Sequence, residues 1–200
     1  MEFNGTFELD DVTVEEVWLA LSDPVMIKHA LPGCQFLTKV EGEDVDFDAL
    51  REAAEDAGED PPTLPEADPE DVAERAFQEG DRYAALVEVG VGSIKPSFET
   101  IVSIDRRDFP EMDASGEGSA SNSSFEMDSG MVLSETDDGG VKLEWWAETD
   151  VFGKLAQMGQ RMLNPVANRV INRFFKQIEN ELSEVGDESE GLADRIRGLI

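Results

Sequence analysis

Alternating apolar and polar residues predict the first element of the chain. Between Glu2 and Leu9, the side chains of Phe3, Phe7 and Leu9 fall on one face, and polar residues occupy the other. This period of two is typical of a β-strand with one buried face. We therefore expect a half-buried strand at the start of the domain.

Two short helices are predicted directly after this strand. Thr13 and Glu16 have the spacing of a capping box, which favours a helix from Val14 to Leu21. Asp23-Pro24 starts a second helix that runs to Ala30, since proline is well tolerated in a first helical turn. A second strand is expected from Gln35 to Val40.

The period of two returns in the second half of the chain and predicts five further strands. They are Tyr83–Val91, Phe98–Ile104, Met112–Gly118, Phe125–Leu133 and Val141–Ala147. The short spacers between most of them indicate an antiparallel meander. The weak, glycine-containing pattern of Met112–Gly118 predicts an edge strand or a bend.

A helical period replaces the alternation from Gly153 to Ser183, where apolar residues form one broad face. A helix of this length needs the concave face of a sheet to bury it. The sequence thus predicts an α+β fold of the helix-grip type. Seven antiparallel strands would wrap a long C-terminal helix, with two short helices after the first strand.

The domain organisation follows from shifts in composition. We expect a helix-grip domain over 1–183, with an insertion over 43–80 that is rich in acids and prolines. The few apolar residues of the insertion suffice to dock it on a surface but not to build a core. Residues 184–200 would be an acidic linker and a short amphipathic tail, which either folds back or touches a membrane.

The concave face predicts a cavity for an apolar ligand, because a curved sheet that grips one helix tends to leave space at one end. Ordinary helix-on-sheet packing explains the same apolar pattern, although methionines suit adaptable apolar sites. The residues expected to line the cavity are Phe98, Phe125, Met127, Met131, Leu143, Trp145, Leu155, Met158 and Met162.

Catalytic chemistry has little support in the sequence. His29 is the single histidine and Cys34 the single cysteine, and no grouping has metal-ligand spacing. An enzyme of cyclase or hydrolase type would need polar residues inside the cavity, for which Thr100, Ser129 and Glu99 are the candidates. The sequence favours a protein that is not an enzyme and has no covalent cofactor or metal.

The net charge of −30, from 46 acids and 16 bases, excludes nucleic acid as a partner. Acids spread along the chain, with lysine scarce, are typical of proteins adapted to molar salt, where repulsion is screened; an acidic binding surface is the alternative. No apolar run reaches the roughly 20 residues of a transmembrane helix. The N-terminus has no signal-peptide pattern and one cysteine allows no disulfide, so we expect a cytoplasmic protein.

One stretch departs from the acidic composition. From Val151 to Ile178 there is no acid, and the five bases there fall within about 120° of helical arc. They could dock a protein partner or a membrane, and ion pairing with neighbouring loops is an equal alternative. These bases are Lys154, Arg161, Arg169, Arg173 and Lys176. Trp146 is expected to face outward, next to the inward Trp145.

Several segments resemble the carbon monoxide dehydrogenase G-subunit family, within the START-like superfamily, also known as SRPBCC. They extend in order over most of the domain: Phe3–Phe7, Val14–Pro24, Ala30–Cys34, Val89–Phe98, Ser115–Gly118, Gly153–Leu163 and Phe174–Phe175. The acidic insertion over 43–80 is foreign to the family pattern.

The resemblance implies a START/Bet v 1-like helix-grip fold with an apolar cavity. It also implies a non-catalytic carrier of a quinone or lipid. Such a carrier would be accessory to a molybdenum hydroxylase of the CO dehydrogenase type and would link that enzyme to the inner face of the membrane. A START-like cyclase or hydrolase and a ligand-free docking module are the alternatives.

Overall fold

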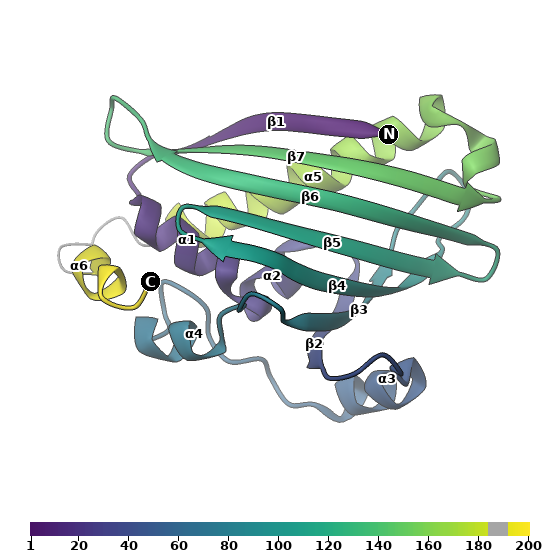
Figure 1. Cartoon of the computed structure of the whole chain (residues 1–200), viewed down its shortest axis with the longest axis horizontal. Coiled ribbons are helices and arrows are strands. Elements are labelled where there is room, and N and C mark those ends of the chain that lie inside the picture. Colours follow the sequence, from purple (N-terminus) through teal and green to yellow (C-terminus); the bar gives the residue numbers. More distant parts are fainter. Residues whose placement is uncertain (184–191) are drawn as a thin grey trace.

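A computed structural model describes residues 1–183 and 192–200 and contains one antiparallel sheet of seven strands. The spatial order is β1-β7-β6-β5-β4-β3-β2, so β1 and β2 form the two edges (Figure 1). The strands are β1 Glu2–Leu9, β2 Cys34–Val40, β3 Arg82–Glu88, β4 Ser97–Asp108, β5 Glu111–Ala120, β6 Ser123–Glu135 and β7 Val141–Gly153. The helices are α1 Val14–Ser22, α2 Pro24–Ala30, α3 Phe47–Asp56, α4 Pro69–Arg75, the 3₁₀ turn η1 Ala156–Met158, α5 Gln160–Ser183 and α6 Leu192–Arg197.

The long helix α5 lies against one face of the sheet, which we call the inner face, together with α1 and α2 (Figure 1). The ring of Phe175 on α5 stacks on Phe7 of β1 at 5.3 Å and contacts Trp145 of β7 at 5.9 Å between centroids. These contacts fix which side of each strand faces the helix. The predicted helix-grip fold is confirmed.

The long helix begins later than the sequence predicted. Residues up to Gly153 remain in β7, where Gly153 pairs with Ser123 of β6. Gly153 and Gly159 both adopt positive φ, at 77° and 74°, and they bracket the 3₁₀ turn that leads into Gln160. The ladder to β6 holds this segment extended, so the prediction of a helix from Gly153 was wrong.

Strand β5 lies between β4 and β6 rather than at an edge, contrary to the prediction for Met112–Gly118. Its inward glycines make room for large neighbours. A Cβ atom at Gly118 would stand 2.4 Å from the ring of Phe125, its partner on β6. The glycines that weakened the strand pattern therefore serve packing across the ladder.

The main core lies where α1, α2 and the C-terminal half of α5 meet the sheet. Trp18, Met26, Leu143 and Ile178 are almost completely buried there. The predicted capping box of α1 is confirmed, because Thr13 N donates to Glu16 Oε2 (2.7 Å) and Glu16 N donates to Thr13 Oγ1 (3.3 Å). This cap fixes where the chain turns from β1 beneath the sheet.

The segment between β2 and β3 packs in two different ways. Helix α3 covers the outer face of β2, β3 and β4, where it shields Phe36 and Leu86. Farther along, Leu64 and Val72 are fully buried in the main core. The sequence predicted that the insertion would dock on a surface without building a core of its own, and the docking is deep enough for Leu64 and for Val72 of α4 to join the main core.

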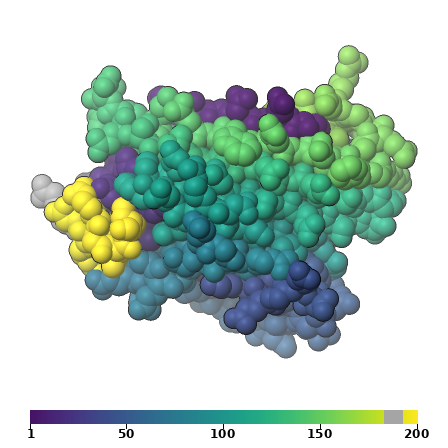
Figure 2. Space-filling view, in the orientation of Figure 1, coloured from purple at the N-terminus to yellow at the C-terminus, as the bar shows by residue number. Residues whose placement is uncertain are grey.

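The C-terminal tail folds back onto the body of the protein. Ile196 of α6 is completely buried, and Arg197 and Arg195 form ion pairs with Glu15 (2.7 Å) and Asp68 (2.9 Å). Figures 1 and 2 show α6 in yellow beside α4. The acidic linker expected from Glu184 to Gly191 lies outside the described residues.

Candidate ligand-binding site

Three rows of side chains cross the inner face of β7, β6 and β5. The row nearest the main core consists of Trp145, Met131 and Met112. The next row holds only small side chains, Ala147, Ser129 and Ala114, and the third holds Thr149, Met127 and Gly116. The middle of the inner face is therefore lined with small residues, with large apolar residues throughout the row on the core side and Met127 alone in the row on the other side.

The facing surfaces of the sheet and the N-terminal half of α5 remain partly exposed, although they point toward each other. By contrast, the residues around Leu143 and Ile178 are almost fully buried. Both opposed surfaces therefore retain apolar area that packing among the described residues does not fully cover. The partly exposed inward residues are Val102, Ala114, Phe125, Met127, Met131, Trp145, Ala147 and Val151 on the sheet and Leu163, Val166, Val170 and Phe174 on α5.

A small apolar cluster lies at the end of the inner face farthest from the main core. Phe98 and Phe125 meet edge to face at 5.4 Å, and Leu155 is buried against them. Met158 of the turn η1 packs on the same cluster. Four of the nine predicted cavity residues thus gather at one end of the inner face.

The other predicted cavity residues are distributed differently. Met127, Met131 and Trp145 lie on the inner face, and each is partly exposed. Leu143 lies in the main core with 1% exposure, and Met162 on the first turn of α5 is 47% exposed. The nine residues are therefore divided: Met131 and Trp145 pack against the main core, to which Leu143 belongs, four gather at the far end of the inner face, Met127 lies between these groups, and Met162 is on the exposed start of α5.

The small residues in the middle of the inner face were missed in the sequence. Ala114, Gly116 and Ala147 carry no chemical signal of their own. They are recognisable only when the register places them side by side on three adjacent strands. Knowledge of the strand pairing would have found them.

The polar residues proposed for catalysis are not assembled by the fold. Glu99 faces outward and lies 3.4 Å from Arg51 of α3. Thr100 Oγ1 and Ser129 Oγ lie on the inner face and donate to the backbone carbonyls of Phe98 and Ala114. The expected carboxylate is thus absent from the inner face at this position, and the two hydroxyls are engaged with backbone.

His29 and Cys34 have structural surroundings. The His29 ring contacts Asp60 at 3.0 Å, and this carboxylate also binds Lys28 Nζ. The Lys28 hydrogen bond is the largest influence that lowers the pKa of Asp60. Burial raises the pKa of the Cys34 thiol to about 11, although the charge of Lys28 opposes this, so the thiol is unreactive at neutral pH.

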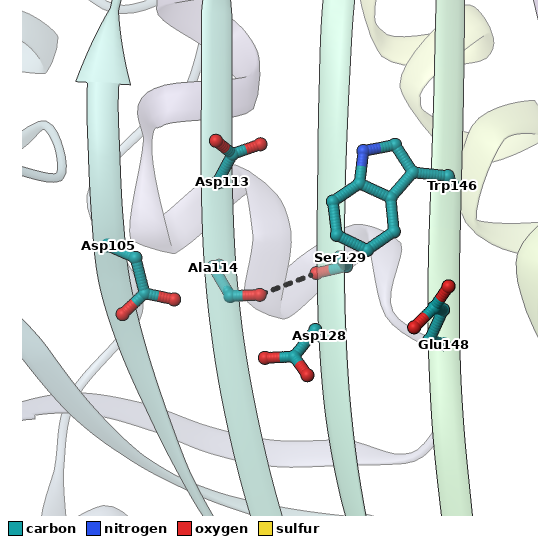
Figure 3. Close-up of a pocket in the computed structure, with 7 residues that line it drawn as sticks. All are labelled: Asp105, Asp113, Ala114, Asp128, Ser129, Trp146 and Glu148. Atoms are coloured by element: carbon teal, nitrogen blue, oxygen red, sulfur yellow. Dashed lines mark hydrogen bonds between the residues drawn. The ribbon is translucent and has the colours of Figure 1, made fainter.

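Trp146 faces outward, as strand alternation predicts, and is 42% exposed. Figure 3 shows it at a shallow depression on the outer face of the sheet, surrounded by acidic side chains. The carboxylates there are Asp105, Asp113, Asp128 and Glu148. Asp113 is neutralised by Arg106 at 2.8 Å.

The five bases that stood out in the sequence are all exposed along α5 and the segment before it. Among residues 1–183 and 192–200, none of Lys154, Arg161, Arg169, Arg173 and Lys176 forms an ion pair. Of the two explanations for this stripe, ion pairing with neighbouring loops therefore finds no support. None of the described helices is long and apolar enough to cross a membrane.

Comparison with solved structures supports the same architecture. A conserved protein from Geobacillus kaustophilus is 25% identical, with a TM-score of 0.68 over 92% of this chain and 97% of that chain. The Zhui aromatase/cyclase from Streptomyces sp. R1128 is 12% identical (TM-score 0.57, 95% and 98% covered). A START superfamily protein from Mycobacterium smegmatis is 10% identical (TM-score 0.55, 92% and 98% covered).

Comparison with curated protein sequences gives no match. The model of the carbon monoxide dehydrogenase G-subunit family (CoxG) matches residues 74–183, which include five strands of the sheet, η1 and α5. This match covers more than half of the chain. The protein therefore belongs to the carbon monoxide dehydrogenase G-subunit (CoxG) family.

Proposed function

We propose that the protein binds an apolar small molecule, an isoprenoid quinone or a lipid, between the inner face and the N-terminal half of α5. The observation that carries this proposal is the partial exposure of opposed apolar surfaces around a floor of small residues, Ala114, Ser129 and Ala147. An apolar ligand would remove these surfaces from water. Each 100 Å² of apolar area so covered contributes about 2.5 kcal/mol.

The chemistry of the lining supports a carrier rather than an enzyme. The inward hydroxyls of Thr100 and Ser129 donate to backbone carbonyls, and Glu99 points away. Methionine side chains such as Met127, Met131 and Met158 adapt to ligands of irregular shape. A flexible isoprenoid or acyl chain suits such walls.

Family membership supports a cellular role beside an enzyme. The proposed role is that of an accessory to a molybdenum hydroxylase of the CO dehydrogenase type, which the protein would bring into contact with a membrane-derived ligand. Contact with the membrane would be peripheral. The resident site of the protein would need neither a metal nor a covalent cofactor.

Native mass spectrometry of the purified protein tests the proposal directly. We expect the protein to carry a bound molecule, which extraction into organic solvent identifies as a quinone or lipid. After this ligand has been removed, we expect the extracted protein to take up decylubiquinone. Folding of the extracted protein is checked by circular dichroism, so that loss of uptake cannot be attributed to unfolding. A folded protein that is isolated empty and takes up neither decylubiquinone nor a phospholipid would overturn the proposal.

A further inference from the structure

The bases of this protein are divided into two groups by their surroundings. Nine of the 16 form ion pairs within the described part of the chain. Arg82 donates to the carbonyl of Gly42, and the guanidinium of Arg107 lies 5.2 Å over the ring of Trp18. The five that remain all belong to one surface, the α5 cationic face, made of Lys154, Arg161, Arg169, Arg173 and Lys176.

The geometry of α5 aligns these charges. Arg161, Arg169, Arg173 and Lys176 are exposed along a length of about 22 Å at 1.5 Å per residue. Exposed asparagines, Asn164, Asn168 and Asn172, lie beside and between them. The face thus presents amide and cationic donors together, and no acid occurs from Val151 to Ile178.

Such a surface is unexpected in a chain with a net charge of −30. Nine of the other eleven bases form ion pairs with carboxylates in the described part of the chain. A row of unpaired guanidinium groups is suited to carboxylates, which arginine binds in a bidentate manner. The missing counter-charges are therefore expected on another molecule.

We propose that the α5 cationic face docks onto an acidic surface of a folded protein partner. A bilayer-binding helix would need large apolar side chains on its exposed side to enter the lipid interface. Within α5 the exposed side has no large apolar residue beyond Met162, and asparagines occupy the intervening positions. Neutral amides and arginines fit the hydrogen-bonding groups of a protein surface.

This surface is separate from the proposed ligand space, although both belong to α5. The side of the helix with Leu163, Val166 and Val170 faces the sheet, and the cationic residues lie on the solvent side. A docked partner would thus contact the helix that forms one wall of the ligand space. The docking inference does not depend on which ligand is bound.

Binding of a short poly-L-glutamate peptide tests the inference, measured at the lowest salt concentration at which circular dichroism shows the native fold. We expect Arg169→Glu and Arg173→Glu each to weaken binding about tenfold or more. Lys142→Glu makes the same change in net charge at the opposite side of the sheet, and we expect it to alter binding less than about twofold. Vesicles of phosphatidylglycerol serve as the second probe.

Each outcome decides the inference. Selective loss in the two α5 variants, with little binding to vesicles, supports it. The inference is overturned if the protein does not bind the peptide, or if Lys142→Glu weakens peptide binding as much as the two α5 substitutions do. It is also overturned if the protein binds vesicles through Arg173 but does not bind the peptide. Native mass spectrometry of the same variants keeps the carrier proposal separate, because a protein that is empty but binds the peptide through α5 refutes only the carrier.

Discussion

Gly118 and Phe125 lie directly opposite each other on β5 and β6, and the phenyl ring fills the volume that a side chain at position 118 would need. A Cβ atom there would stand 2.4 Å from Cε1 of Phe125 and 2.9 Å from Oγ1 of Thr100. The glycine thus allows Phe125 to pack on Phe98 at the end of the proposed ligand space.

We expect Gly118→Ala to destabilise the fold by about 1–3 kcal/mol through overpacking, measured by urea unfolding. Gly90→Ala is the matched control, since no atom lies within 4 Å of a Cβ there. A second substitution, Phe125→Leu, should recover part of the loss. Equal stabilities of the Gly118→Ala and Gly90→Ala variants would contradict the packing argument.

Ala147 offers a direct way to fill the proposed ligand space. Its neighbours across the sheet, Ser129 and Ala114, are also small, so Ala147→Phe places a ring where no large side chain stands. We expect this variant to lower the affinity for decylubiquinone about tenfold or more, equivalent to about 1.4 kcal/mol. Fluorescence titration provides the measurement.

The neighbouring substitution Glu148→Phe is the control for added bulk, because Glu148 faces outward beside Trp146. It should leave decylubiquinone binding unchanged. If both variants bind as the unmodified protein does, the ligand does not occupy the space above Ala147.

The ion pair between Asp23 and Arg75 connects the insertion to the junction of α1 and α2. Asp23 is buried, and it accepts hydrogen bonds from Arg75 Nε (2.8 Å) and Nη2 (2.7 Å). Arg75→Ala would leave the carboxylate buried without its partner, at an expected cost of about 3–5 kcal/mol in unfolding free energy. Thermal unfolding monitored by circular dichroism tests this.

Arg51→Ala is the control, since Arg51 pairs with exposed acids on α3 and the outer sheet face. Its loss should cost less than about 1 kcal/mol. Similar losses in the two variants would show that burial does not set the strength of the Asp23–Arg75 pair.

The partly buried thiol of Cys34 should report on unfolding. Burial raises its pKa to about 11, and its Sγ donates to the carbonyl of Phe36 at 3.3 Å. About a thousandth of the thiol is then ionised at pH 8, whereas in an unfolded chain, with a pKa near 8.5, roughly a quarter is. Labelling by a thiol reagent should be slow in the native protein and fast in denaturant.

The same shift gives a sign for stability at alkaline pH. Because the folded-state pKa lies above the unfolded value, the contribution of Cys34 is complete below about pH 8.5 and is lost as the pH rises toward 11. Cys34→Ala should therefore flatten the decline of stability in this window. Rapid labelling of the native protein at pH 8 would contradict both expectations.

The C-terminal helix α6 is expected to contribute to stability. Ile196→Ala removes a completely buried side chain from the main core and should cost about 2–5 kcal/mol. Leu199→Ala, at a position that is 39% exposed, is the comparison and should cost less than about 1 kcal/mol. Urea unfolding of both variants would show no difference if the tail did not fold back.

The fold was largely predictable because its signals are local. The alternation of β1, the capping box at Thr13 and Glu16 and the helical period of α5 each identify an element from adjacent residues. Short connections then favour an antiparallel order. The expected seven strands and their helix-grip arrangement are those of the structure.

The errors have non-local causes. Strand β5 looked weak because its glycines accommodate Phe125 and Met127 from the next strand, which the sequence of β5 alone does not reveal. The start of α5 depended on how far β7 pairs with β6. The burial of Leu64 and Val72 depended on where the loop before α4 and α4 itself meet the main core.

The candidate site was predictable only in part, for the same reason. Large residues such as Trp145 and Met127 stand out in the sequence, whereas the small residues of the proposed ligand site, Ala114, Gly116 and Ala147, do not. Leu143 and Trp145 point to the same side of β7, but Leu143 is buried in the main core and Trp145 is partly exposed. Their positions along the strand account for this difference. The period of two predicts the side of the sheet on which a residue lies, but not how deeply the residue is buried.

The pairing of β1 with β7 has a consequence for biosynthesis. Leu9 lies opposite Val141, so the strand that is translated early must wait for one of the last strands before its ladder can form. Until then a nascent chain presents β1 with its hydrogen-bonding groups open and Phe3 and Phe7 uncovered, a state that invites aggregation. The ladder between β1 and β7 is thus expected to form late in synthesis, after β7 has been translated.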